Sequence, residues 1–395
     1  MSGDHHHLEE FESLNIEQGT EQVPIQIVQK RRIAIEALSA YILGACYVLP
    51  FNVVMILLAA KNVETNSTLK MYGVTSYMIP NAGAALCLVN FDISANAWLF
   101  ASAAVMIGMY LVQFVSRLIE IHHGIIFFCL ALLGLATGIF QSWVHASISN
   151  GFLPIIHCMI TIGANSIGLL PFLLSLVINS ETVMVWVNSI LGILVVCMSV
   201  WRGFSMNNKI NHPDMRHIKG SLDPALVMIC MFLNFICCFA VYPNVIIYNS
   251  FTSFQAAMLH VLFGIFTTGG SCFMFLNRPV FIILICIVGI KIFASILLIV
   301  LKVKLALWIV FPIHSFMGGM ITVMCFMSLH QLSYVPMQGE VNYTTWVKAV
   351  IVMLLSGIII GTLITTPIFN AVESWHQQKT WVQPETMGMK NATAF

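Results

Sequence analysis

The sequence predicts an all-α integral membrane protein with about eleven transmembrane helices and almost no soluble domain, and three observations predict this class. Hydrophobic residues make up 59% of the 395 residues and charged residues only 8%, whereas a soluble domain carries roughly 25% charged residues. The mean hydropathy is +0.90. Apolar runs of about 20 residues, the length that a helix needs to cross a bilayer, recur along the chain.

The order of these runs predicts six helices, a polar loop and five more helices. The predicted spans are 33–60, 71–90, 96–119, 123–146, 151–179, 182–201, 225–248, 252–277, 279–301, 305–330 and 344–371. The predicted domains are a cytoplasmic N-terminal tail at 1–32, a six-helix bundle at 33–201, a cytoplasmic loop at 202–224, a five-helix bundle at 225–371 and a C-terminal tail at 372–395. The first tail lacks the apolar segment of a signal peptide.

Basic residues predict the orientation, because they favour the cytoplasmic side of a membrane. Lys30, Arg31 and Arg32 precede the first span, and further basic residues lie in the central loop. We therefore expect a multi-pass protein of the plasma membrane, with its N-terminus cytoplasmic and its C-terminus extracytoplasmic. The glycosylation sequon at Asn66 then falls in the first outside loop.

Motifs of several other functional classes are absent from the sequence. It contains no P-loop, no TVGYG selectivity filter, no nucleophile elbow and no zinc-hydrolase motif. The 11 cysteines lie mostly inside apolar runs and form no paired CxxC motifs, which argues against a zinc site or a disulfide framework. We therefore expect no enzyme activity, no cofactor, no metal site and no nucleic-acid partner. The expected partners are a small-molecule solute and the lipid bilayer.

Ten polar side chains fall near the middle of predicted spans, where a polar group is costly unless it faces a cavity or another helix. Lys291 is the sharpest of them, because it lies midway in a strongly apolar run. It either faces a hydrated cavity, or caps backbone carbonyl groups, or is partly neutral. No Asp or Glu lies at this depth, which favours facilitated diffusion over proton coupling. The ten residues are Asn52, Gln113, Gln141, His145, His157, Asn165, Asn234, His260, Lys291 and His314.

Small residues and prolines indicate how the helices pack. Two GxxxG pairs, at 134–138 and 357–361, permit the backbone of a neighbouring helix to approach closely. A proline inside a span can kink the helix and free a carbonyl group, as in many alternating-access carriers. The prolines in or beside predicted spans are Pro50, Pro80, Pro154, Pro171, Pro243, Pro312 and Pro367.

Three short segments, together with the six-plus-five layout, resemble the equilibrative nucleoside transporters. The first span reads YILGACYVLPFN, which is similar to that family's LPWN signature, with Pro50 and Asn52 kept and Phe51 in place of tryptophan. The fourth reads GLATGIFQSWVHA, like a glycine-rich segment that ends in a substrate-contacting glutamine, here Gln141. The seventh reads CFAVYPNV and resembles the FPAV element, with Pro243 at the proline.

The resemblance implies a facilitative, alternating-access transporter of nucleosides and/or nucleobases, with a six-plus-five, major-facilitator-like arrangement of helices. In such a site Gln141 would pair with the edge of a base, because an amide offers both a donor and an acceptor. Phe51 or Trp143 would supply a stacking face. Asn52, which is kept from the signature, belongs to the same expected site.

The eighth span departs from the family pattern. The family carries an Asp and an Arg four residues apart, in a pattern like FDWLGR, and the segment FTTGGS places Thr267 and Ser271 at those positions. Two hydroxyl groups should hold a nucleoside weakly, since charge-assisted hydrogen bonds are roughly twice as strong as neutral ones. Lys291, one span further on, is a candidate for restoring a positive group. The expected substrate-binding set therefore includes Thr267, Ser271 and Lys291.

Two rival functions remain open on the sequence alone. One is a carrier of another small solute, such as an amino acid or a sugar, on a similar number of helices. The other is a membrane receptor or scaffold that transports nothing.

Overall fold

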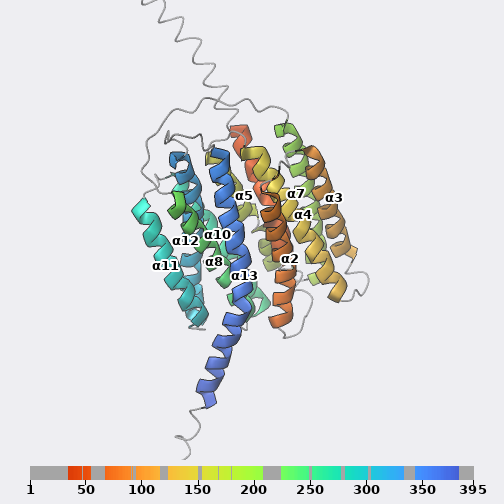
Figure 1. The fold of residues 1–395 in the computed structure, drawn as a ribbon. Helices are drawn as coiled ribbons and strands as arrows, with labels where there is room; N and C mark the ends of the chain where they lie inside the picture. The colour runs from red at the N-terminus through yellow and green to blue at the C-terminus, as the bar shows by residue number, and fades with distance from the viewer. Residues whose placement is uncertain are drawn as a thin grey trace, which may run out of the picture.

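α-Helices account for nearly all of the residues that the computed structural model describes. These residues are 34–46, 48–54, 67–89, 91, 95–115, 123–149, 154–167, 169–178, 180–207, 224–248, 251–276, 281–300, 304–332 and 343–381. The helices run side by side as one bundle (Figure 1). The N-terminal tail, the sequon at Asn66, and residues 208–223 of the central loop lie outside the described residues.

The described helices follow the order that the apolar runs predict. The first helix, Ala34–Val54, is followed by α2 (Ser67–Leu88), α3 (Asn96–Val115), α4 (His123–Ser149), α5 (Pro154–Ile167), α6 (Leu170–Val177), α7 (Glu181–Asn207), α8 (Pro224–Val241), α9 (Asn244–Tyr248), α10 (Ser253–Leu276), α11 (Phe281–Val300), α12 (Lys304–Leu332) and α13 (Tyr343–Trp381). In the described part of the chain, ten segments are long and apolar enough to cross a membrane. The all-α membrane class is confirmed.

The helix α2 is not among those ten segments, although it has 22 residues and corresponds to the second predicted span. Polar residues such as Thr75, Ser76 and Asn81 dilute its apolar character. The last helix also differs from the prediction, because α13 continues to Trp381, past residue 371 where the apolar run ends. The length of an apolar run does not predict a polar continuation of this kind.

Two predicted spans are each divided into two helices, and a proline lies at each division. Pro171 follows the break between α5 and α6, and Pro243 lies between α8 and α9. Because proline has no N–H, Pro243 leaves the carbonyl oxygen of Phe239 without its helical partner. The Asn244 side chain replaces that partner, since its Nδ2 donates to Phe239 O at 2.7 Å. The expectation that a proline frees a carbonyl group is confirmed at this position.

We refer to the first six spans and the last five as two groups, and helix contacts join the two groups along two seams. In the first group α2 packs on α4, and α3 packs on α4 and α7. In the second group α8 packs on α13, and α12 packs on α10, α11 and α8. Contacts of α2 with α13 make one seam, and contacts of α5 with α10 and α12 make the other.

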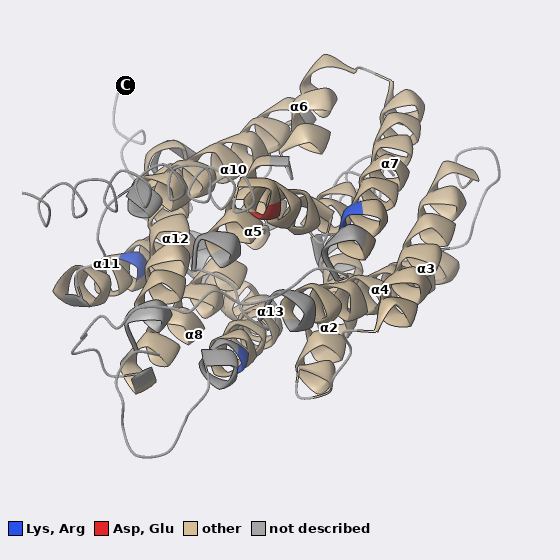
Figure 2. Cartoon of the chain, turned by 90° about the horizontal axis from the view of Figure 1, so that it is seen from above, with Lys and Arg blue, Asp and Glu red and all other residues tan. Residues whose placement is uncertain are grey.

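The ends of the described chain lie at opposite ends of the bundle. In Figure 1 the first helix (red) begins at the top, whereas α13 (blue) ends below the rest of the bundle. Charged residues are almost absent from the described helices when the bundle is seen from above (Figure 2). The described helices therefore carry few charged groups, as the apolar interior of a bilayer requires.

Both GxxxG pairs lie at close helix crossings, as predicted. A Cβ atom added to Gly134 or Gly138 would overlap a carbonyl oxygen of α2, at Tyr77 or Asn81. A Cβ atom added to Gly357 would lie 2.7 Å from Phe232 O of α8, and the same holds at 2.9 Å for Gly361 and Ile236 O. The glycines thus let α4 approach α2, and α13 approach α8, backbone to backbone.

We expect Gly134→Ala to lower the stability of the protein, because the added methyl group forces α4 away from the α2 backbone. Overpacking of this kind costs about 1–3 kcal/mol. The matched control is Gly108→Ala in α3, where an added Cβ meets nothing within 4 Å. That change should be neutral or stabilising, since alanine favours a helix by about 0.5–1 kcal/mol over glycine. Thermal unfolding of the two purified variants gives the comparison, and equal midpoints would contradict the crossing.

Candidate functional site

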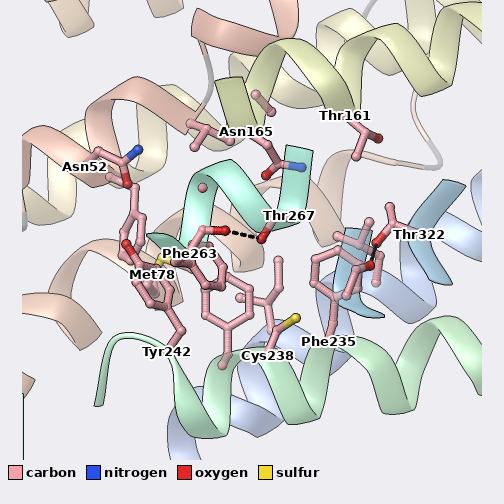
Figure 3. A pocket seen from close by; sticks show the side chains of 18 of the residues that line it. Asn52, Met78, Thr161, Asn165, Phe235, Cys238, Tyr242, Phe263, Thr267 and Thr322 are labelled. Carbon is pink, nitrogen blue, oxygen red and sulfur yellow. Dashed lines mark hydrogen bonds between the residues drawn. The ribbon is translucent and has the colours of Figure 1, made fainter. Parts of the chain in front are cut away.

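A cavity of about 170 Å³ lies between the two groups of spans. Its lining comes from the first helix, α2, α4, α5 and α6 on one side, and from α8, α10, α12 and α13 on the other. Side chains from separate helices converge on it, among them Asn52, Asn165, Thr267 and Tyr242 (Figure 3). The volume is below the roughly 300–1,000 Å³ of sites for drug-sized ligands, so the cavity suits a small solute.

Aromatic rings make up much of the cavity wall. The rings of Tyr242 and Phe263 are stacked, with centroids 3.8 Å apart and planes 3° from parallel. Phe51, from the first group of spans, meets Tyr242 edge to face at 6.1 Å. The His260 ring lies next to Tyr242, with centroids 5.3 Å apart, and stacks on Phe172 at 4.3 Å. The eight phenylalanine and tyrosine residues in the lining are Phe51, Tyr77, Phe172, Phe235, Phe239, Tyr242, Phe263 and Phe326.

The polar part of the lining consists of uncharged groups, since no Asp, Glu, Lys or Arg is among the described residues of the wall. Some of these groups already have protein partners. Asn81 Nδ2 donates to the Tyr77 hydroxyl at 3.2 Å, and Thr267 Oγ1 donates to Phe263 O at 2.6 Å (Figure 3). The amides of Gln141 and Asn165 make no hydrogen bond to another described residue. Each leaves a donor and an acceptor for a solute.

Four of the seven residues that the sequence predicts for substrate binding line this one cavity. Phe51 and Asn52 come from the first helix, Gln141 comes from α4 and Thr267 comes from α10. Gln141 and Asn52 are 5% and 7% exposed. The helices thus bring together residues that are more than 200 positions apart in the sequence.

Trp143 and Ser271 are not among the lining residues. Trp143 is fully buried and packs where α4 meets α3 and α7, because Leu99 and Gly203 lie against the same space. Residues two apart on a helix point about 200° from one another, so a cavity-facing Gln141 places Trp143 on the far side. Ser271 lies one turn beyond Thr267 and donates to Thr267 O at 2.9 Å. Its hydroxyl is therefore used within α10.

Lys291 lies behind the cavity wall rather than in it. The side chain is 1% exposed, and its Nζ donates to Asn234 Oδ1 at 2.5 Å and to Cys238 Sγ at 2.9 Å. The sequence leaves open whether Lys291 caps backbone carbonyl groups. In the structure its acceptors are two side chains. Cys238 itself lines the cavity, so a residue of the cavity wall contacts the ammonium group directly.

Several lining residues are not singled out for binding by the sequence. Tyr77, Tyr242 and Phe263 belong to apolar runs in which an aromatic residue is as consistent with packing as with binding. Asn165 is a polar residue in mid-span, which indicates either a binding site or a hydrogen bond to another helix. The sequence alone does not distinguish these two roles. Asn234 is likewise a polar residue in mid-span and does bond another helix, with Nδ2 3.0 Å from Thr322 Oγ1.

One comparison with known proteins identifies the fold. No protein-family model matches the sequence, and no curated protein matches it. Among solved structures, the chain is similar to the proton:xylose symporter XylE of the major facilitator superfamily, bound to 6-bromo-6-deoxy-D-glucose. The TM-score is 0.60 at 9% sequence identity, and the match covers 89% of this chain and 95% of that chain. The likeness confirms a major-facilitator-like arrangement of the helices and does not single out the equilibrative nucleoside transporters.

Proposed function

We propose that this chain, an integral membrane protein with a major-facilitator-like fold, is a facilitative transporter of nucleosides and/or nucleobases that works by alternating access. The observation that carries the proposal is the cavity between the two groups of spans, which combines aromatic rings with two amides that make no hydrogen bond to another described residue. We also place the protein in the plasma membrane with its N-terminus in the cytoplasm.

The chemistry of the lining fits a flat, uncharged solute with polar edges. Aromatic side chains bind a planar ring by offset stacking or edge-to-face contact, and Phe51, Tyr242 and Phe263 offer ring faces and edges at the wall. The edge of a nucleobase carries both donors and acceptors, which an amide matches in either orientation. Gln141 and Asn165 come from α4 and α5 and would read that edge.

The placement of the cavity supports alternating access. Both groups of spans contribute to the wall, so that rocking of one group against the other would expose the site to each side of the membrane in turn. The divided spans α5–α6 and α8–α9 both contribute residues to the lining, for example Asn165 and Cys238. Helices interrupted near the binding site are frequent in carriers of this kind.

The rival functions make different demands on the same site. A sugar would also use amides, hydroxyl groups and an aromatic face, and the similar XylE structure holds a glucose derivative. An amino acid needs a partner for its ammonium group, and no carboxylate is among the described residues of the wall. A receptor or scaffold requires no flux at all.

Uptake by the purified full-length chain in proteoliposomes tests the proposal. We expect saturable uptake of radiolabelled adenosine, uridine or adenine, with competition among the three and trans-acceleration by solute inside the vesicles. Xylose, glucose and a panel of amino acids should compete poorly. Uptake of a sugar without competition by nucleosides would replace the proposed substrate, and absence of any saturable flux would contradict transport.

We expect this uptake to be independent of a proton gradient. No Asp or Glu is among the described residues of the cavity wall, and a carboxylate that binds and releases protons is a common means of coupling. The initial uptake rate should therefore be equal with an inward proton gradient, without a gradient, and after addition of an uncoupler. A gradient that strongly accelerates uptake would contradict the prediction and direct attention to the cavity histidines His145 and His260.

A further inference from the structure

A buried lysine lies beside the cavity, and no acidic residue in the described part of the chain pairs with it. Lys291 is 1% exposed and lies in the middle of α11. A buried charge is costly in a membrane and is kept mainly where it serves binding or a pathway. The surroundings of the ammonium group therefore indicate what it does.

The polar groups around Lys291 are oriented toward a positive charge. The amide nitrogen of Asn234 lies 3.0 Å from Thr322 Oγ1 and 3.4 Å from Gly318 O, and it donates to both of these acceptors. The amide oxygen is consequently left to accept from Lys291 Nζ. Cys238 Sγ is the second acceptor, at 2.9 Å. A lysine ammonium has three donors, so one N–H remains beyond these two.

Three residues on this side of the cavity lie against the ammonium group or against its partner Asn234, and we call them the basic wall: Cys238, Gly318 and Thr322. All three line the cavity. A Cβ atom at position 318 would lie 2.7 Å from Lys291 Nζ and 3.3 Å from Cys238 Sγ. The absence of a side chain at Gly318 therefore leaves the room in which the ammonium approaches the cavity.

We infer that Lys291 gives this side of the cavity a positive potential, so that the site binds a negatively polarised or anionic oxygen of its solute at the basic wall and excludes cations. Low-dielectric walls concentrate such a potential in an enclosed site. No acidic residue of the described lining offsets it. The binding of a transported solute rests on the proposed function. The positive potential does not, and it is measurable without transport.

Cys238 provides a native reporter of that potential. We expect a negatively charged methanethiosulfonate reagent (sulfonatoethyl) to modify Cys238 faster than a positively charged one of similar size (trimethylammonioethyl). Each reagent forms a mixed disulfide with the thiolate and releases methanesulfinate. The rate ratio, relative to the same two reagents on free cysteine, should favour the anion by at least about tenfold, given the field of a unit charge several ångströms away at an effective dielectric constant near 20.

Matched variants assign the ratio to Lys291. In Lys291→Met the ratio should fall to the value for free cysteine, and in Lys291→Arg it should persist. The ratio is used because Lys291 also affects the reactivity of the thiolate, and that effect is common to both reagents. Cys238→Ala measures the background from the ten other cysteines, with modification quantified by mass spectrometry of the full-length protein.

The wild-type result alone is decisive if Lys291→Met does not fold. A wild-type ratio equal to that of free cysteine would overturn the inference, and so would a failure of both reagents to reach Cys238. In proteoliposomes, a carboxylated pyrimidine should compete with uridine in the wild type and about tenfold less well in Lys291→Met. If the anionic reagent modifies Cys238 faster but no nucleoside is taken up, the positive potential at the basic wall is supported and the proposed function is rejected.

Discussion

Gln141→Leu should raise the half-saturation concentration for nucleoside uptake by about 5- to 150-fold, or abolish measurable uptake, because a buried hydrogen bond with one partner removed costs about 1–3 kcal/mol. Gln141 is 5% exposed, lines the cavity and has no hydrogen bond to another described residue. The solute is therefore its expected partner. Leucine keeps most of the volume while removing both the donor and the acceptor, so that the polar edge of a bound base is left unpaired.

The control for Gln141→Leu is Gln113→Leu in α3. Gln113 is equally buried, at 5% exposure, but is not among the residues that line the cavity. Initial rates over a range of uridine concentrations, normalised to the amount of protein in the vesicles, separate the two variants. Gln113→Leu should leave the half-saturation concentration unchanged even if it lowers the yield of protein. Unaltered uptake kinetics in Gln141→Leu would remove this residue from the site.

The second large effect is expected in stability, from Asn234→Leu. This change removes the acceptor that lies 2.5 Å from Lys291 Nζ and leaves the ammonium group with the weaker acceptor Cys238 Sγ. Hydrogen bonds to a charged group contribute about 1.5–3 kcal/mol. We expect a clear decrease in the midpoint of thermal unfolding, measured by intrinsic fluorescence of the detergent-solubilised protein.

A double variant tests whether the charge is the cause of this decrease. Lys291→Met removes the charge together with its desolvation cost, and replacement of buried charges by apolar residues is often neutral or stabilising. Asn234→Leu combined with Lys291→Met should therefore be more stable than Asn234→Leu alone, although it carries one more substitution. If the stability changes of the two substitutions simply add, Asn234 does not act by stabilising the buried ammonium group.

The order of the membrane spans is determined by the sequence itself. Every backbone polar group in a bilayer must be satisfied within the protein, so that each crossing is a helix of about 20 apolar residues. That requirement acts locally and is visible in every span, for example in α11. The division of the seventh span has an equally local cause, since Pro243 cannot donate to Phe239 O whatever surrounds it.

Which face of each helix meets the cavity was decided only by the tertiary structure. In a soluble helix the apolar stripe marks the buried face, but here the faces toward lipid and toward other helices are both apolar. Gln141 and Trp143 are therefore equivalent candidates in the sequence, and only the packing of α4 against α2 and α3 separates them. Thr267 and Ser271 are one turn apart on the same face of α10, and only the tertiary structure determines that the cavity reaches the first and not the second.

The partner of Lys291 is likewise a property of the fold. Asn234 is 57 positions away on α8, and Gly318 lies on α12. The sequence determines that a charge lies in mid-membrane and that no carboxylate lies at the same depth to pair with it. Only the crossing of α8, α11 and α12 determines that this charge is held by a neutral amide and a thiol and lies directly behind the cavity wall. The physical reason is that a lysine side chain is neutralised or solvated by whatever atoms surround it in space, and those atoms come from three helices distant in sequence.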